Sequence, residues 1–196
     1  SNAYDYALLS CKIEPQNHRF LNNLGLILKE KKLYIKAKAA FHKAITISPK
    51  YAEAHNNLGT LLQFNQPDQA IYHYNIAEKD KSILFEVFLN KASAYRQQED
   101  HKLALKYVKK AIRINPTNSR CNKLIGILYL DKGNFSRAKF YLKQALKYKP
   151  YEPETYRLLS KISKLKNFEI KNLIKLLNEK FFSKNKEKHI LFLLAE

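Results

Sequence analysis

The chain has 196 residues, of which 45% are hydrophobic and 27% charged, and its 36 lysines and arginines outnumber 17 acidic residues to give a net charge of +19. No apolar run approaches the roughly 18 residues of a membrane span, and no glycine-rich phosphate loop or nucleophile elbow occurs. Composition therefore excludes a membrane-spanning chain and indicates no catalytic, metal or cofactor site.

The amino-terminal end is predicted to be cut rather than natural. Residues 1–3 (Ser1-Asn2-Ala3) are typical of the remnant of a cleaved expression tag, and the chain contains no methionine. Residues 4–16 are expected to form the second helix of a helical hairpin whose first helix is missing. This helix closes at Pro15, because proline is not tolerated inside a helix.

Prolines recur at a nearly constant interval along the chain. Pro15, Pro49, Pro116 and Pro150 are separated by 34, 67 and 34 residues, and 67 is close to twice 34. Periods of this length are typical of stacked helical hairpins, in which the proline lies where one hairpin ends and the next begins. No useful stretch alternates with period two, so the sequence predicts an all-α chain.

Small residues recur at fixed positions within four successive units. The units are counted from His18, Ala52, Phe85 and Ser119. Position eight is held by Gly25, Gly59, Ala92 and Gly126, and alanines recur at positions twenty and twenty-seven. A glycine inside a helix costs about 1 kcal/mol relative to alanine, so its recurrence predicts a close approach of the second helix.

This pattern resembles the tetratricopeptide repeat, which implies an all-α, right-handed superhelix of antiparallel helix hairpins. The predicted repeats span residues 17–50, 51–84, 85–118 and 119–152. A degenerate repeat at 153–182 and the start of a truncated helix at 183–196 are expected to follow. The second repeat lacks one residue near Pro67 and has no proline at Ser82, so its junction with the third repeat is expected to be bent or longer.

The resemblance implies that the first helix of each repeat lines a concave groove. Position six of these helices holds Asn23, Asn57 and Asn90, and a side-chain amide can both donate to and accept from the backbone of an extended peptide. These residues resemble the asparagine ladder of O-linked N-acetylglucosamine transferases, although Leu124 breaks the pattern in the fourth repeat. The other candidate groove residues are Asn22, Leu26, Asn56, Thr60, Phe64, Leu89, Ser93, Lys123 and Ile127.

Two functions remain open at this point. The first is a non-catalytic scaffold that binds an extended segment of a partner protein in the groove. The second is the substrate-recruiting arm of a larger sulfotransferase or glycosyltransferase. It rests on residues 156–196, which resemble the segment that joins repeats to a sulfotransferase domain in some bacterial proteins. The chain itself is expected not to be an enzyme, and the activity of the full-length protein stays open.

Charge and reactive side chains give no sharper assignment. The carboxyl-terminal half carries +14 of the net charge, mostly as lysines on the outer faces of second helices. We interpret these lysines as a solvent-exposed surface, and nucleic acid is disfavoured as a partner. The distant Cys11 and Cys121 favour a reducing, cytoplasmic compartment, and His55 is interpreted as a packed side chain. End-to-end self-association through the apolar ends of the chain is expected.

Overall fold

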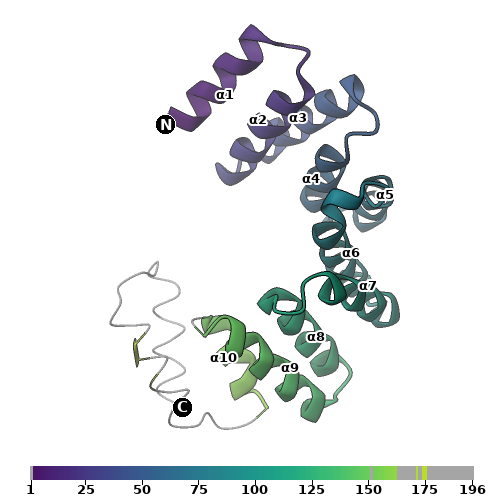
Figure 1. Ribbon diagram of the computed structural model, residues 1–196, viewed down its shortest axis with the longest axis vertical. Helices are drawn as coiled ribbons and strands as arrows, with labels where there is room; N and C mark the ends of the chain where they lie inside the picture. The colour runs from purple at the N-terminus through teal and green to yellow at the C-terminus, as the bar shows by residue number, and fades with distance from the viewer. Residues whose placement is uncertain (1, 151, 163–170, 172–173, 176–196) are drawn as a thin grey trace. The chain divides into compact units, whose positions relative to one another are not determined.

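The computed structural model describes residues 2–150, 152–162, 171 and 174–175, and these residues form helices and turns without a strand (Figure 1). The α-helices are α1 (Asn2–Ile13), α2 (His18–Glu30), α3 (Tyr34–Ile47), α4 (Ala52–Leu62), α5 (Pro67–Ala77), α6 (Leu84–Gln97), α7 (His101–Ile114), α8 (Ser119–Asp131), α9 (Phe135–Tyr148) and α10 (Pro153–Ser160). The predicted all-α class is confirmed.

Some predictions fall outside the described residues. They concern the second helix of the degenerate repeat, the truncated helix at 183–196, the self-association of that end, and most of the transferase-like segment. The described chain divides into two compact units, Ser1–Ala111 and Ile112–Glu196. The first unit holds α1 to α6 and most of α7, and the second holds α8 to α10.

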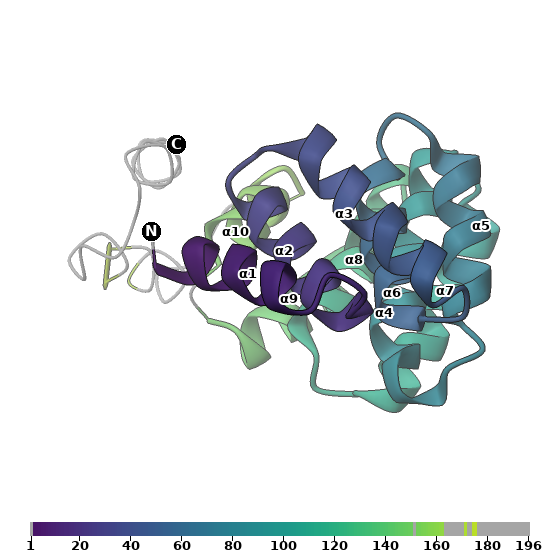
Figure 2. The ribbon, with the colours of Figure 1, turned by 90° about the horizontal axis from the view of Figure 1, so that it is seen from above.

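Consecutive helices pair as hairpins within each unit. In the first unit α2 packs against α3 and α4 against α5, while α3 contacts α4 and α5 contacts α6 (Figure 2). In the second unit α9 packs against both α8 and α10. Side chains cap several helix starts: the Asn17 side chain accepts hydrogen bonds from the backbone N–H groups of Arg19 and Phe20 at the start of α2.

A comparison of the turns inside the hairpins shows which residue the second repeat lacks. Lys32, Glu99 and Gly133 have positive φ angles of 61°, 59° and 70°, and each occupies position fifteen of its repeat. The following backbone N–H bonds back over five residues in these turns, as Leu33 does to Leu28. In the second repeat Gln66 N–H instead bonds to Leu62 O, four residues back, and no described residue of that turn has a positive φ. The second repeat therefore lacks the residue at position fifteen, which has a positive φ angle in the other three repeats.

The glycines at position eight lie directly against a side chain of the second helix. A Cβ atom on Gly25 would lie 2.5 Å from Phe41 Cε1, and one on Gly59 would lie 2.6 Å from Tyr74 Cε1. In the second unit a Cβ atom on Gly126 would lie 2.7 Å from Leu142 Cγ. The predicted close approach is confirmed, and the side chain at position twenty-four fills the space of the absent Cβ.

The junction between the second and third repeats contains a short 3-10 helix, η1 (Lys81–Ile83). Asp80 fixes its start, because the Asp80 carboxylate accepts hydrogen bonds from Ser82 N at 2.8 Å and from Ser82 Oγ at 2.7 Å. The helix stands where the other repeat boundaries have a proline. An extra helical turn therefore replaces the proline stop, and the expectation of a longer junction is confirmed.

Candidate peptide-binding face

The candidate groove residues of the first unit lie on three first helices that are neighbours. α2 contacts α4, and α4 contacts α6. We call the surface that these three helices share the helix-A face. It carries Asn22, Asn23, Leu26, Asn56, Asn57, Thr60, Leu89, Asn90 and Ser93, and Phe64 follows in the turn after α4. Lys123 and Ile127 lie on α8 in the second unit and are described with it.

The position-six amides bond to the preceding repeat. Asn57 Nδ2 donates to Asn22 Oδ1 at 2.9 Å, and Asn90 Nδ2 donates to Asn56 Oδ1 at 3.0 Å. We call these contacts the amide ties. They use the donors of Asn57 and Asn90, whereas no donor among the described residues reaches their Oδ1 atoms. Asn90 uses both N–H groups of its amide and Asn57 uses one, so Asn90 presents its Oδ1 acceptor to a ligand, and Asn57 presents its Oδ1 acceptor and one N–H.

The remaining candidates on this face differ in accessibility. Asn23 is exposed, so its amide faces solvent, while Asn22 is only 4% exposed. Leu89 is 3% exposed and belongs to the interior, and Leu26 is half-buried against the core. Ser93 Oγ donates to Leu89 O at 3.1 Å. The accessible candidates on this face are the exposed Asn23 and Phe64 and the half-buried Leu26, Asn56, Asn57, Thr60, Asn90 and Ser93.

A hollow of about 720 Å³ lies where the ends of α2 and α4 meet the start of α3. We call it the rim hollow. Its lining residues are Lys29, Tyr34, Ile35, Lys38, Thr60, Leu61, Leu62, Phe64, Asn65 and Gln66. Thr60 and Phe64 were candidates from the sequence, whereas the α3 residues were missed because only first helices were considered. The run Leu33-Tyr34-Ile35 in a hairpin turn was the available signal.

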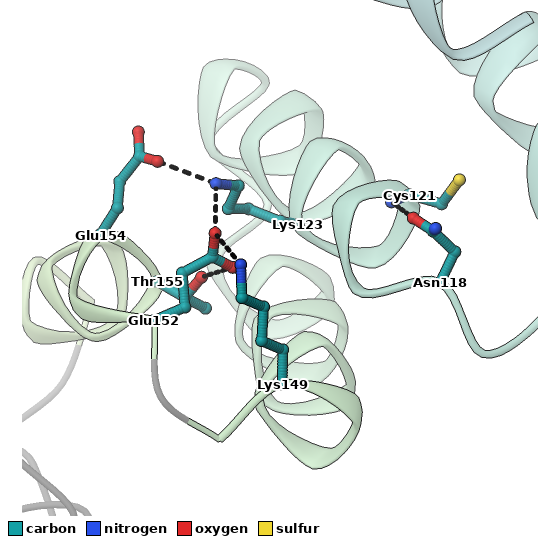
Figure 3. Close-up of polar contacts among 7 residues, drawn as sticks. All are labelled: Asn118, Cys121, Lys123, Lys149, Glu152, Glu154 and Thr155. Atoms are coloured by element: carbon teal, nitrogen blue, oxygen red, sulfur yellow. Dashed lines mark hydrogen bonds and ion pairs between the residues drawn. The ribbon is translucent and has the colours of Figure 1, made fainter. Parts of the chain in front are cut away.

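In the second unit Lys123 is bound to carboxylates at the start of α10 (Figure 3). Lys123 Nζ lies 3.0 Å from Glu152 Oε1 and 2.8 Å from Glu154 Oε2, and its side chain is 18% exposed. Burial lowers the pKa of Lys123, but its hydrogen bonds to Glu154 and Glu152 outweigh burial and raise it. Lys123 thus joins α8 to α10. Ile127 packs against the cluster around Leu142 and Leu159.

Lys91 is a buried lysine that the repeat pattern did not predict. Lys91 is 1% exposed and occupies position seven, where the other repeats have Leu24, Leu58 and Ile125. Its Nζ donates to Asn75 Oδ1 at 2.7 Å, forms an ion pair with Glu78, and lies 4.2 Å from the centroid of the Tyr107 ring. Burial raises the pKa of Glu78, but Lys91 and Lys110 outweigh it, so the pKa lies below its usual value.

Three histidines, His42 on α3, His55 on α4 and His73 on α5, lie close together. His55 Nε2 lies 3.0 Å from Pro49 O and donates to it, so His55 Nδ1 accepts from His73 Nδ1 at 2.9 Å. Burial, followed by the charges of His55, His42 and Lys38, lowers the pKa of His73 to about 4. His55 is 3% exposed, which confirms it as a packed side chain.

Among the residues that the structure describes, no group of three or more His, Cys, Asp or Glu side chains could hold a metal ion. None of the described helices is long and apolar enough to cross a membrane.

Family models agree with the register and the hairpin geometry. Three models, each described as tetratricopeptide repeat, match residues 18–51, 60–119 and 95–162. The chain is built from tetratricopeptide repeats. No curated protein sequence matches it.

Solved structures share the tetratricopeptide fold at low sequence identity. PilW, a type IV pilus biogenesis factor, is 21% identical over 94% of this chain and 87% of its own, with a TM-score of 0.79. TTC0263, a repeat protein of Thermus thermophilus, is 19% identical over 91% of this chain and all of its own, with a TM-score of 0.73. YrrB, a repeat protein with an unusual peptide-binding site, is 14% identical over 99% of this chain and 100% of its own, with a TM-score of 0.65. These likenesses establish a tetratricopeptide solenoid.

Proposed function

We propose that the chain is a non-catalytic interaction scaffold that binds an extended peptide segment of a partner protein along the helix-A face. The observation that carries the proposal is the orientation of Asn57 and Asn90. Their Nδ2 groups are held by the amide ties, so their Oδ1 atoms are fixed as acceptors. An extended peptide offers backbone N–H groups to such acceptors regardless of its side chains.

The spacing of the repeats also suits an extended ligand. Neighbouring helices pack about 8–10 Å apart, and an extended chain rises about 3.3 Å per residue, so one acceptor per repeat meets roughly every third peptide residue. The peptide-binding site named for YrrB supports the same class of function on a related scaffold. Asn23, which is exposed, supplies an amide on the first of the three helices.

The proposal is tested with peptides selected against the wild-type chain from a random display library. Asn57→Ala removes both the amide tie and the acceptor, whereas Asn22→Ala removes the tie and leaves the acceptor. We expect Asn57→Ala and Asn90→Ala to weaken binding about fivefold each, because a lost hydrogen bond contributes about 1 kcal/mol. Asn22→Ala, as the matched control, is expected to weaken it less. Equal affinities for Asn57→Ala and the wild type in a titration would contradict the acceptor role.

The second hypothesis, a substrate-recruiting arm of a sulfotransferase or glycosyltransferase, rests on the sequence resemblance of residues 156–196 alone. It would use the same binding face in a larger protein, with donor-binding residues beyond Glu196. The native gene downstream of Glu196 tests it. A predicted strand followed by a phosphate-binding loop would support the transferase, and a stop codon or further repeats would remove it.

A further inference from the structure

The rim hollow is lined by several exposed apolar side chains. Ile35, Phe64 and Tyr34 are 88%, 74% and 53% exposed, and Leu61 and Leu62 also line the space. The exposed residues come from two consecutive repeats, with Tyr34 and Ile35 at the start of α3 and Phe64 after α4. Apolar side chains that cluster around a hollow are typical of a binding site, because a ligand removes them from water.

The charges around the hollow have one sign. Lys29 and Lys38 line it, both are half-buried, and neither forms an ion pair with a described residue. None of the lining residues is acidic. Two ammonium groups beside an apolar hollow, with no ion-pair partner among the described residues, attract a ligand carboxylate. The hollow therefore favours an occupant that carries negative charge beside apolar side chains.

The hollow is continuous with the helix-A face. Thr60 lines the hollow, and Thr60 Oγ1 also lies 3.4 Å from Asn90 Nδ2 on that face. Asn65 and Gln66 add uncharged hydrogen-bonding groups at the edge. A peptide lying along the helix-A face can thus continue into the hollow. A second copy of this chain is a poor occupant, because each copy carries a net charge of +19.

We propose that the rim hollow binds an acidic segment of the partner peptide, in which an aspartate or glutamate stands beside an aromatic or branched aliphatic side chain. The apolar side chain lies among Ile35, Phe64 and Leu61, and the carboxylate is bound by Lys29 and Lys38. This inference rests on the proposed peptide-binding function and deepens it by naming the chemistry of the partner.

The test starts from the random display library used for the helix-A face. We expect the selected peptides to be enriched in acidic residues next to aromatic or aliphatic ones. Replacing their Asp and Glu by Asn and Gln is expected to weaken binding about tenfold, as is the Lys29→Gln/Lys38→Gln variant of the protein. Ile35→Ser and Phe64→Ser change exposed residues and are expected to weaken binding by a similar factor.

Matched controls come from the second unit. Phe140→Ser changes a phenylalanine that is 57% exposed, and Lys139→Gln/Lys147→Gln removes the same charge as the double lysine variant. Both controls are expected to leave peptide binding unchanged. Equal effects of the control and hollow variants would overturn the inference, because they would assign the acidic preference to net charge.

The other outcomes separate this inference from the proposed function. Peptides that bind and lose affinity in Asn57→Ala, but show no acidic enrichment, would overturn the inference alone. Recovery of no peptide at all would overturn both. Binding of a single-stranded oligonucleotide that is lost in Phe64→Ser, without peptide binding, would replace the acidic peptide by nucleic acid and overturn the inference as well.

Discussion

The two units join their repeats at the same register position with different chemistry. In the first unit Asn22 and Asn56, at position five, accept hydrogen bonds from neutral amides of the following repeat. In the second unit Lys123, also at position five, forms ion pairs with Glu152 and Glu154. Position five is thus a joint between repeats in both units. A contact between neutral amides is insensitive to salt and pH, whereas an ion pair responds to both.

A second contrast concerns how each unit holds a lysine. Lys91 is 1% exposed and is enclosed by Glu78, Asn75 and Tyr107. The Lys123 side chain is 18% exposed, and its partners Glu152 and Glu154 are 15% and 55% exposed. A buried ion pair is costly to break because it leaves an uncompensated charge, while exposed pairs contribute little. The two lysines should therefore respond very differently to loss of a partner.

The largest effect is expected for Glu78→Gln. The change leaves the buried Lys91 ammonium with neutral partners only, and we expect it to lower the free energy of unfolding by about 3 kcal/mol. Adding Lys91→Met removes the buried charge and should restore most of the loss. Urea unfolding followed by circular dichroism measures both. Failure of the second substitution to restore stability would show that Glu78 acts through something other than Lys91.

The amide tie is expected to contribute less. Asn57→Leu leaves the buried Asn22 amide without its donor, and we expect a loss of about 1–3 kcal/mol. The double change Asn22→Leu/Asn57→Leu should recover much of it. In the third and fourth repeats the same two register positions hold Leu89 and Leu124. Asn23→Leu, on the exposed position, is the control and should be close to neutral.

Acid is expected to weaken the first unit through His73. Its folded-state pKa of about 4 lies below the usual 6.5, so unfolding takes up a proton between these values and stability falls as the pH drops from about 6.5 to about 4. His73→Tyr, which introduces the residue found at the same position as Tyr107 and Tyr141, should flatten this slope. Melting temperatures across the pH range test it. Parallel slopes for variant and wild type would assign the acid sensitivity to other groups.

Salt is expected to have the smallest effect and to act on the second unit. Lys123→Gln should lower stability by about 1 kcal/mol at low salt, and the difference should shrink as salt is added. The Asn57→Leu loss should not change with salt, because it involves no charge. Hydrogen exchange of α8 and α10 compared with α2 and α4 measures the two joints separately. A salt-dependent loss in α2 and α4 would contradict the neutral tie.

Much of the fold follows from the sequence because each repeat obeys the same local constraints. Gly25 and Gly59 recur where the second helix leaves no room for a Cβ atom, so spacing alone predicts the close approach. The sequence shows that the second repeat lacks one residue near Pro67. It does not show that the other repeats have a residue with a positive φ angle at that position. Spacing places residues on a face and leaves open which backbone angles close a turn.

The candidate site was less predictable, because it depends on contacts between repeats. The type and position of Asn57 were evident, yet the occupation of its Nδ2 by Asn22 depends on a partner 35 residues away. Lys91 is buried only because Glu78 and Tyr107 converge on it from neighbouring helices. The repeat pattern does not predict such contacts, because it describes the residues within one repeat and not those that meet from neighbouring repeats.

The contact between positions eight and twenty-four limits how the protein can be recombined. Gly25 faces Phe41, Gly59 faces Tyr74 and Gly126 faces Leu142, while the third repeat has Ala92 with the smaller Val108 at these positions. A second helix that carries a large side chain here can follow only a first helix with glycine. The unit that evolution or a protein engineer can exchange is therefore the complete hairpin. In a chimaera that places Ala92 opposite Phe41, the alanine Cβ atom would prevent the two helices from packing together.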